Sequence, residues 1–179
     1  GTYILEPKVL DFIPSAENYS FEYGLFPDLL KRQEPFYAHI PSRVYWIDIG
    51  TPERYLQVHS DLLSNKVGRI HIKERRGQFD AATVAEIDDL SMIGDDCQIK
   101  PGAQIINSVL GQGCFVEERA RVENSVIWPH TRIGTAAHVT GAIVGRGCHI
   151  GRSAVVGPGS ALGDKTSLTD YTITGVQPA

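Results

Sequence analysis

Aliphatic residues recur every five or six positions through the second half of this 179-residue chain. A helix would place them about every 3.6 residues and an ordinary strand every second residue, so neither element explains the spacing. From residue 105 the pattern closes on itself every 17 residues. A period near six, with three units per turn, fits a coil that folds through three flat faces and stacks on itself. The aliphatic positions are Ile87, Ile93, Ile99, Ile105, Leu110, Val116, Val122, Ile127, Ile133, Val139, Val144, Ile150, Val156, Leu162 and Leu168.

A second set of small or branched residues stands four positions after most of these aliphatics. Glycine often follows an aliphatic, as at Gly94, Gly111 and Gly134, and it suits places where the backbone turns sharply or takes a positive φ. This hexapeptide pattern looks like a left-handed parallel β-helix, which we expect to be all-β and to hold about four and a half coils. The second set is Cys97, Ala103, Val109, Cys114, Ala120, Val126, Thr131, Ala137, Ile143, Cys148, Ala154, Ser160 and Thr166.

All three cysteines, Cys97, Cys114 and Cys148, belong to this second set. We therefore expect buried thiols that behave as small apolar side chains. No CxxC motif or Cys/His cluster occurs, which disfavours a disulfide framework or a zinc site. A reducing cytoplasm is the expected setting.

Composition removes several classes of partner. The net charge of −4 gives no reason to expect nucleic acid or an anionic membrane as a partner. No apolar run approaches the length of a membrane span, and the N-terminus lacks a signal-peptide pattern. We expect a soluble chain with neither kind of partner.

The first 65 residues lack the repeat and have α/β character. Strand-like runs occupy residues 3–5, 36–40 and 43–49, with short helical stretches between the first two. The sequence Thr51-Pro52-Glu53 predicts a helix start, because it combines a hydroxyl N-cap, a proline in the first turn and an acid beside the positive helix end. We expect an α/β unit at 1–65, a connector at 66–86 and the β-helix at 87–179.

The α/β unit is small for a stable core of its own, since about 65 residues fold alone only marginally. The chain also opens directly on a strand-like run without a starting methionine. We expect it to be the C-terminal portion of something longer.

Asp48 is the main candidate for chemistry. It ends an apolar run and precedes the predicted helix start. A carboxylate there could hold Mg²⁺ beside a phosphate, because Mg²⁺ prefers hard oxygen ligands and often bridges protein to phosphates. The alternative is that Asp48 only caps a turn.

Residues 1–63 resemble the C-terminal part of the catalytic domain of sugar-nucleotide pyrophosphorylases, which has a Rossmann-like fold. The similarity is closest to mannose-1-phosphate guanylyltransferases and glucose-1-phosphate nucleotidyltransferases, in which such a segment precedes hexapeptide repeats. The motifs that carry it are GTYILEPKVLDFIP, FEYGLFPDLL, FYAHI and VYWIDIGTPERYLQVHSDLL.

The resemblance implies roles for three residues. Asp48 matches the family's Mg²⁺-binding aspartate, Glu22 matches an acid near the sugar, and Gly1 matches a glycine that lines the sugar pocket. Tyr23 departs from the pattern, because guanylyltransferases often have lysine there. This departure weakens the expectation of a charged contact to the sugar phosphate at this position.

The resemblance also implies features that this sequence lacks. The glycine-rich loop G-G-x-G-x-R-L that cradles the nucleotide phosphates is absent, as are the family's other Mg²⁺-binding aspartate and sugar-phosphate lysine. We therefore expect no catalytic residue in this fragment and no activity from it alone. The parent enzyme would use Mg²⁺ to join a sugar-1-phosphate and a nucleoside triphosphate, with GDP-mannose as the first expected product, and would form a homo-oligomer through the β-helix.

Two other classes of function remain open. Many hexapeptide proteins are acyltransferases that use a histidine as general base, and His130, His138 and His149 are the candidates here. However, His138 and His149 are 11 residues apart rather than 17, so they would not share a column. The third reading is a non-catalytic regulatory or scaffold subunit. Trp128 would then contact a partner, although it could equally pack on the next coil.

Overall fold

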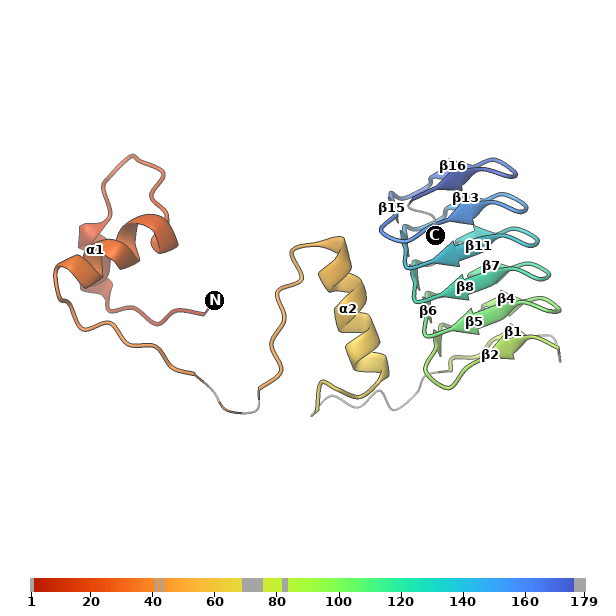
Figure 1. The fold of residues 1–179 in the computed structure, drawn as a ribbon, viewed down its shortest axis with the longest axis horizontal. Helices are drawn as coiled ribbons and strands as arrows, with labels where there is room; N and C mark the ends of the chain where they lie inside the picture. The colour runs from red at the N-terminus through yellow and green to blue at the C-terminus, as the bar shows by residue number, and fades with distance from the viewer. Residues whose placement is uncertain (1, 41, 43, 69–75, 82–83, 176–179) are drawn as a thin grey trace. The chain divides into compact units, whose positions relative to one another are not determined.

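The computed structural model describes residues 2–40, 42, 44–68, 76–81 and 84–175. These residues form two compact units, Gly1–Val44 and Tyr45–Ala179. Each unit is treated by itself below (Figure 1).

The first unit contains short helical elements. They are the 3₁₀ helix η1 (Pro7–Phe12), the π-helical turn η2 (Phe21–Leu25) and the helix α1 (Phe26–Lys31). The Ser20 hydroxyl accepts a hydrogen bond from the Tyr23 backbone N–H at 3.2 Å, so Ser20 caps η2. An aromatic cluster of Tyr3, Phe21, Phe26 and Phe36 holds these elements together, with ring centroids 4.9–6.3 Å apart.

The predicted strands at 3–5, 36–40 and 43–49 do not form among the described residues. These segments are extended but pair with no other strand. Ile40 and Trp46 remain 89% and 71% exposed. A strand needs a neighbour to satisfy its backbone hydrogen bonds, and the described part of the chain supplies none to them.

In the second unit, α2 (Pro52–Leu63) begins where the sequence predicts a helix. The Thr51 hydroxyl accepts a hydrogen bond from the Arg54 backbone N–H at 3.3 Å, and Pro52 occupies the first turn. No helix in the described part of the chain is both long and apolar enough to cross a membrane.

The rest of the second unit is the predicted left-handed parallel β-helix. Its strands form three sheets, in which every pairing is parallel (Figure 1). One six-stranded sheet has the order β1-β4-β7-β10-β13-β16, the other β17-β14-β11-β8-β5-β2, and the five-stranded sheet β15-β12-β9-β6-β3. The bounds are β1 Asp80–Ala81, β2 Glu86–Ile87, β3 Met92–Ile93, β4 Gln98–Ile99, β5 Gln104–Ile106, β6 Val109–Leu110, β7 Phe115–Val116, β8 Arg121–Glu123, β9 Val126–Ile127, β10 Arg132–Ile133, β11 His138–Thr140, β12 Ile143–Val144, β13 His149–Ile150, β14 Val155–Val156, β15 Ala161–Leu162, β16 Ser167–Leu168 and β17 Ile173–Thr174.

The aliphatic column is confirmed. Ile105 pairs with Val122, and Val122 with Val139. The aliphatics from Ile93 to Val156 are at most 1% exposed. Each therefore stacks on its equivalent one coil away, and together they form the core.

The second set needs one correction. Val109, Val126 and Ile143 begin strands of the five-stranded sheet and point outward. The corner before each of these strands is one residue shorter, because only five residues separate successive aliphatics there. The inward corner position therefore falls one residue earlier, at Ser108, Ser125 and Ala142, which are at most 1% exposed.

The cysteines are buried thiols, as predicted. Cys97, Cys114 and Cys148 are 1–2% exposed and none forms a disulfide. The Sγ atoms of Cys97 and Cys114 donate to the carbonyls of Gly111 and Trp128 at 3.1 and 3.4 Å. Each thiol thus links its coil to the next.

Candidate functional site

Asp48 lies on the extended segment that leads into α2. Its side chain is exposed. A Cβ added at Gly50 would lie only 3.6 Å from Asp48 Oδ1. The glycine therefore leaves space beside the carboxylate for another group.

The metal expectation can be tested against this geometry. Within the described residues, no three His, Cys, Asp or Glu side chains gather in a way that could hold a metal ion. Asp48 offers one exposed carboxylate, which fits a Mg²⁺ that takes few ligands from protein and the rest from phosphates and water. The chain alone does not supply a full coordination shell.

The segment that carries Asp48 is tied to α2 by Asp61. This carboxylate is 8% exposed and accepts hydrogen bonds from the Tyr45 hydroxyl at 2.7 Å and from Gln57 Nε2 at 2.9 Å. Lys66 Nζ lies 3.4 Å from Oδ1. The hydrogen bond from Tyr45, followed by those from Gln57 and Lys66, lowers the pKa of Asp61 despite its burial.

Glu22 lies in the first unit, on η2. Its carboxylate is exposed and accepts a hydrogen bond from the Tyr3 hydroxyl at 2.8 Å. The same bond raises the pKa of Tyr3. Gly1, the other residue expected near the sugar, lies outside the described residues. The neighbouring Tyr23 side chain is 90% exposed, so it is free to meet a ligand or another part of a domain.

The three histidines of the acyltransferase reading are all exposed. His138 and His149 begin strands of different sheets, β11 and β13. His130 lies at a corner with φ of 60°. The expected outward orientation of His138 and His149 is confirmed.

Trp128 is half-buried at a corner. The Arg146 guanidinium, from the next coil, lies 5.1 Å from the centroid of its ring. This is a cation–π contact. Trp128 thus packs on the next coil, as one of its two readings predicts.

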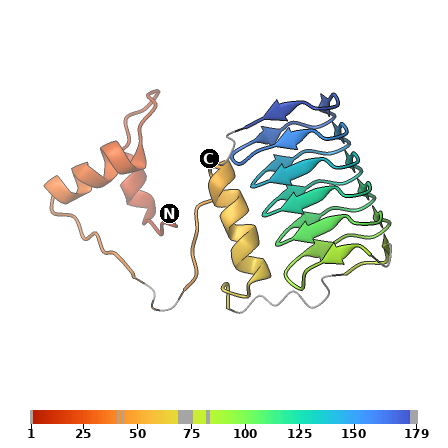
Figure 2. The ribbon, with the colours of Figure 1, turned by 45° about the vertical axis from the view of Figure 1, so that its right-hand side comes forward.

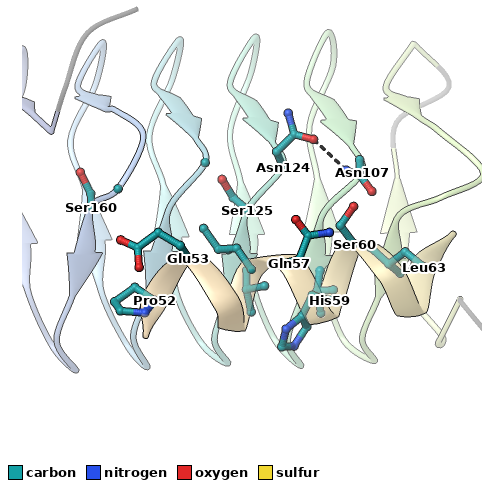
Figure 3. A pocket seen from close by; sticks show the side chains of 15 residues that line it. Pro52, Glu53, Gln57, His59, Ser60, Leu63, Asn107, Asn124, Ser125 and Ser160 are labelled. Atoms are coloured by element: carbon teal, nitrogen blue, oxygen red, sulfur yellow. Dashed lines mark hydrogen bonds between the residues drawn. The ribbon is translucent and has the colours of Figure 1, made fainter. Parts of the chain in front are cut away.

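A groove between α2 and the β-helix was not predicted from the sequence (Figure 3). It has a volume of about 310 Å³ and runs past Leu56 and Ser60 on α2 and past Val109 and Val126 on the five-stranded sheet. Val126 is 5% exposed although it points outward, because this side of the sheet is covered. Figure 2 shows α2 alongside the stacked coils. One available signal was the pair Asn107 and Asn124, spaced by the coil period of 17.

Comparisons with known proteins divide the chain in the same order as the sequence motifs. Residues 1–65 match the nucleotidyl transferase family model. Residues 73–173 match the model of the EIF2B subunit epsilon LbH domain.

Three bacterial relatives are sugar-1-phosphate nucleotidyltransferases. The UTP–glucose-1-phosphate uridylyltransferase of Synechocystis is 33% identical over 100% of this chain and 47% of its own length. The mannose-1-phosphate guanylyltransferase of Mycobacterium tuberculosis is 28% identical over 85% of this chain and 36% of its own. The glucose-1-phosphate adenylyltransferase of Corynebacterium jeikeium is 31% identical over 88% and 45%. The chain thus spans less than half the length of these relatives.

Proposed function

This chain belongs to the family of sugar-1-phosphate nucleotidyltransferases that carry a hexapeptide-repeat β-helix, and we propose that it forms the C-terminal part of such an enzyme. In the proposed reaction, an oxygen of the sugar-1-phosphate attacks the α-phosphorus of a nucleoside triphosphate. A P–O bond forms there, the bond to the β-phosphate oxygen breaks, and pyrophosphate leaves. The observation that carries the proposal is the order of the two family matches, with the exposed Asp48 between them on the segment that enters α2.

We assign the roles of the site residues on the same basis. Asp48 would hold Mg²⁺, which supplies neutralisation of phosphate charge when bound. Glu22 and Gly1 would contact the sugar. The exposed carboxylate of Glu22, oriented by the Tyr3 hydroxyl at 2.8 Å, is suited to accept hydrogen bonds from sugar hydroxyls.

The 179-residue chain alone would be inactive. The reaction depends on positioned cations and backbone donors around the phosphates. The chain has no glycine-rich phosphate loop, and its described residues present no metal-binding cluster. Asp48 cannot replace that apparatus by itself.

Activity is best tested on a longer protein that contains this chain, beside the chain alone. Measuring the intact mass in the source cells, against 19.6 kDa for this chain, would first show whether a longer protein exists. The first substrate pair is GTP with mannose-1-phosphate. The second is UTP with glucose-1-phosphate, because the uridylyltransferase relative matches over the whole chain. Sugar-nucleotide formation by the 179-residue chain alone would overturn its proposed inactivity.

The role of Asp48 has a matched control. In the longer protein, Asp48→Asn should lower kcat/KM by about 10²–10³-fold, the usual cost of removing one group that stabilises transition-state charge. Asp11→Asn removes an exposed carboxylate from η1 and should leave activity unchanged. Equal activity of the two variants would refute the assignment of Asp48.

We also propose that the β-helix mediates self-association. Its last coils expose Tyr171 and Ile173, which are 67% and 59% accessible. Exposed strand edges and apolar surface favour pairing with another chain. Light scattering should therefore give a mass above that of one chain, and a strictly monomeric mass at high concentration would contradict this proposal.

A further inference from the structure

The groove between α2 and the β-helix contains polar groups that no described part of the chain satisfies. Among the described residues, two buried side-chain oxygens have no hydrogen-bond partner: Asn107 Oδ1 and Ser160 Oγ. Both residues line this groove (Figure 3). Buried polar atoms are nearly always hydrogen-bonded, so two exceptions in one cavity call for an explanation.

Ser160 lacks a partner because of a break in a regular ladder. The hydroxyls of Ser91, Ser108 and Ser125 each accept the backbone N–H of the residue 17 positions later, at 3.1 Å. Ala142 comes next in this column and has no hydroxyl. Ser160 follows Ala142, as the pairing of Ile143 with Ala161 shows, and its side chain is 9% exposed without a partner among the described residues.

Asn107 is half satisfied. Its Nδ2 donates to Asn124 Oδ1 at 2.7 Å, and its backbone N–H donates to Asp88 Oδ2 at 2.9 Å. The remaining carbonyl oxygen, Oδ1, can only accept. A group that completes this amide must therefore be a donor, such as a hydroxyl.

The corner column beside the groove narrows along the stack. Asn107 and Asn124 are followed at the same corner by Gly141 and Gly159. A Cβ added at Gly159 would meet no atom within 4 Å. The groove is therefore open at the Ser160 end because the corner there carries no side chain.

The lining also limits the charge of a ligand. No lysine or arginine is among the described residues that line the groove, so an anion would lack a counter-charge. The only carboxylate in this lining is that of Glu53, whose own backbone N–H and the Thr51 hydroxyl hold its pKa below the usual value. A cation would therefore find a single carboxylate that is already engaged at the start of α2. The remaining surface includes apolar side chains, such as Leu56 and Val126.

We propose that this groove binds an uncharged polyhydroxy compound, such as a free sugar or a sugar alcohol. Its hydroxyls would donate to Asn107 Oδ1 and hydrogen-bond with Ser160 Oγ, while its C–H faces pack on Leu56 and Val126. Asn107 and Ser160 lie three coils apart, about 14 Å at the usual strand spacing. A monosaccharide would thus occupy one end of the groove, and an oligosaccharide could reach both. The inference concerns binding alone and does not depend on the proposed catalytic function.

The test is a titration of the 179-residue chain followed by ¹H–¹⁵N NMR, with D-glucose and sucrose as probes. We expect saturable shifts of the Asn107 and Asn124 side-chain amides and of α2 backbone amides. Glucose-6-phosphate and inorganic phosphate should bind at least tenfold more weakly than glucose. Absence of saturable shifts with both neutral probes, or tighter binding of either phosphate compound, would overturn the proposal.

The chain itself suggests conservative variants. Asn107→Gly reproduces Gly141, which holds the equivalent corner with a φ of 57°, and Ser160→Ala reproduces Ala142 in the same column. At least one of them should weaken binding of glucose about tenfold, and both should weaken binding of sucrose. Ser60→Phe fills the groove and should abolish binding, whereas Arg54→Phe places the same ring on an exposed position of α2 and should not. Wild-type affinity in the folded Asn107→Gly and Ser60→Phe variants would place any binding elsewhere and refute the site.

Discussion

The Tyr45 hydroxyl donates a 2.7 Å hydrogen bond to Oδ2 of Asp61, 16 residues later, and so ties the segment before α2 to the last turn of that helix. Asp48 lies between the two residues, on the segment held by this bond. The position of the candidate metal ligand thus depends on a contact made elsewhere on α2.

Replacing Tyr45 by phenylalanine should lower the free energy of unfolding by about 1–2 kcal/mol, because the buried Asp61 carboxylate loses a hydrogen bond. Urea unfolding followed by tryptophan fluorescence measures this change, since Trp46 is the next residue. Tyr37→Phe is the control, because the Tyr37 side chain is 87% exposed. Equal midpoints for both variants would show that the tie contributes nothing.

Acid should weaken the same contact. Hydrogen bonds from Tyr45, Gln57 and Lys66 lower the pKa of Asp61 in the folded state. A depressed carboxyl pKa contributes stability that is present above the unfolded-state pKa and is lost as the pH falls through the folded-state value. Between about pH 7 and about pH 3, wild type should therefore lose more stability than Asp61→Asn. Parallel pH profiles of the two proteins would contradict this.

The coils should discriminate sharply between glycines. A Cβ at Gly94 would lie 2.7 Å from the Gln112 backbone nitrogen, whereas one at Gly163 would meet nothing within 4 Å. Gly94→Ala should destabilise by about 1–3 kcal/mol through overpacking, and Gly163→Ala should change stability by less than about 0.5 kcal/mol. Thermal unfolding monitored by circular dichroism compares the two, and a similar loss in both would refute close stacking at Gly94.

The corner at Asn124 should tolerate glycine better than alanine. Asn124 has a φ of 49°, and its structural equivalent, Gly141, has a φ of 57°. Alanine in this left-handed region costs about 1–2 kcal/mol, which asparagine partly avoids and glycine does not incur. Asn124→Ala should therefore be the less stable variant in urea unfolding. The reverse order would mean that the Asn107–Asn124 hydrogen bond outweighs backbone strain.

The β-helix could be predicted because its repeat is a one-dimensional signal. Each aliphatic from Ile93 to Val156 is buried as expected. The error at Val109, Val126 and Ile143 arose where one residue is missing from a corner, since a fixed offset of four then points to the wrong side of the strand. The serine ladder at Ser91, Ser108 and Ser125 occupies that corner instead.

The first unit was harder to predict. Ser20 and Thr51 were recognisable as caps because capping is local. The strands expected at 36–40 and 43–49 require partners that no local pattern supplies, and they do not form among the described residues. The groove was missed for a related reason: the sequence does not reveal that α2 lies against the five-stranded sheet.

The exact 17-residue register of the middle coils, in which Val122 and Val139 pair directly, has a consequence for inheritance. A gene segment that encodes one coil can be duplicated or lost in frame while each remaining side chain keeps its column. The length of the stack can therefore change over evolutionary time without a new fold. The interval between Asn107 and Ser160 would be the exception, because any lineage that depends on their shared groove would have to retain the number of coils between them.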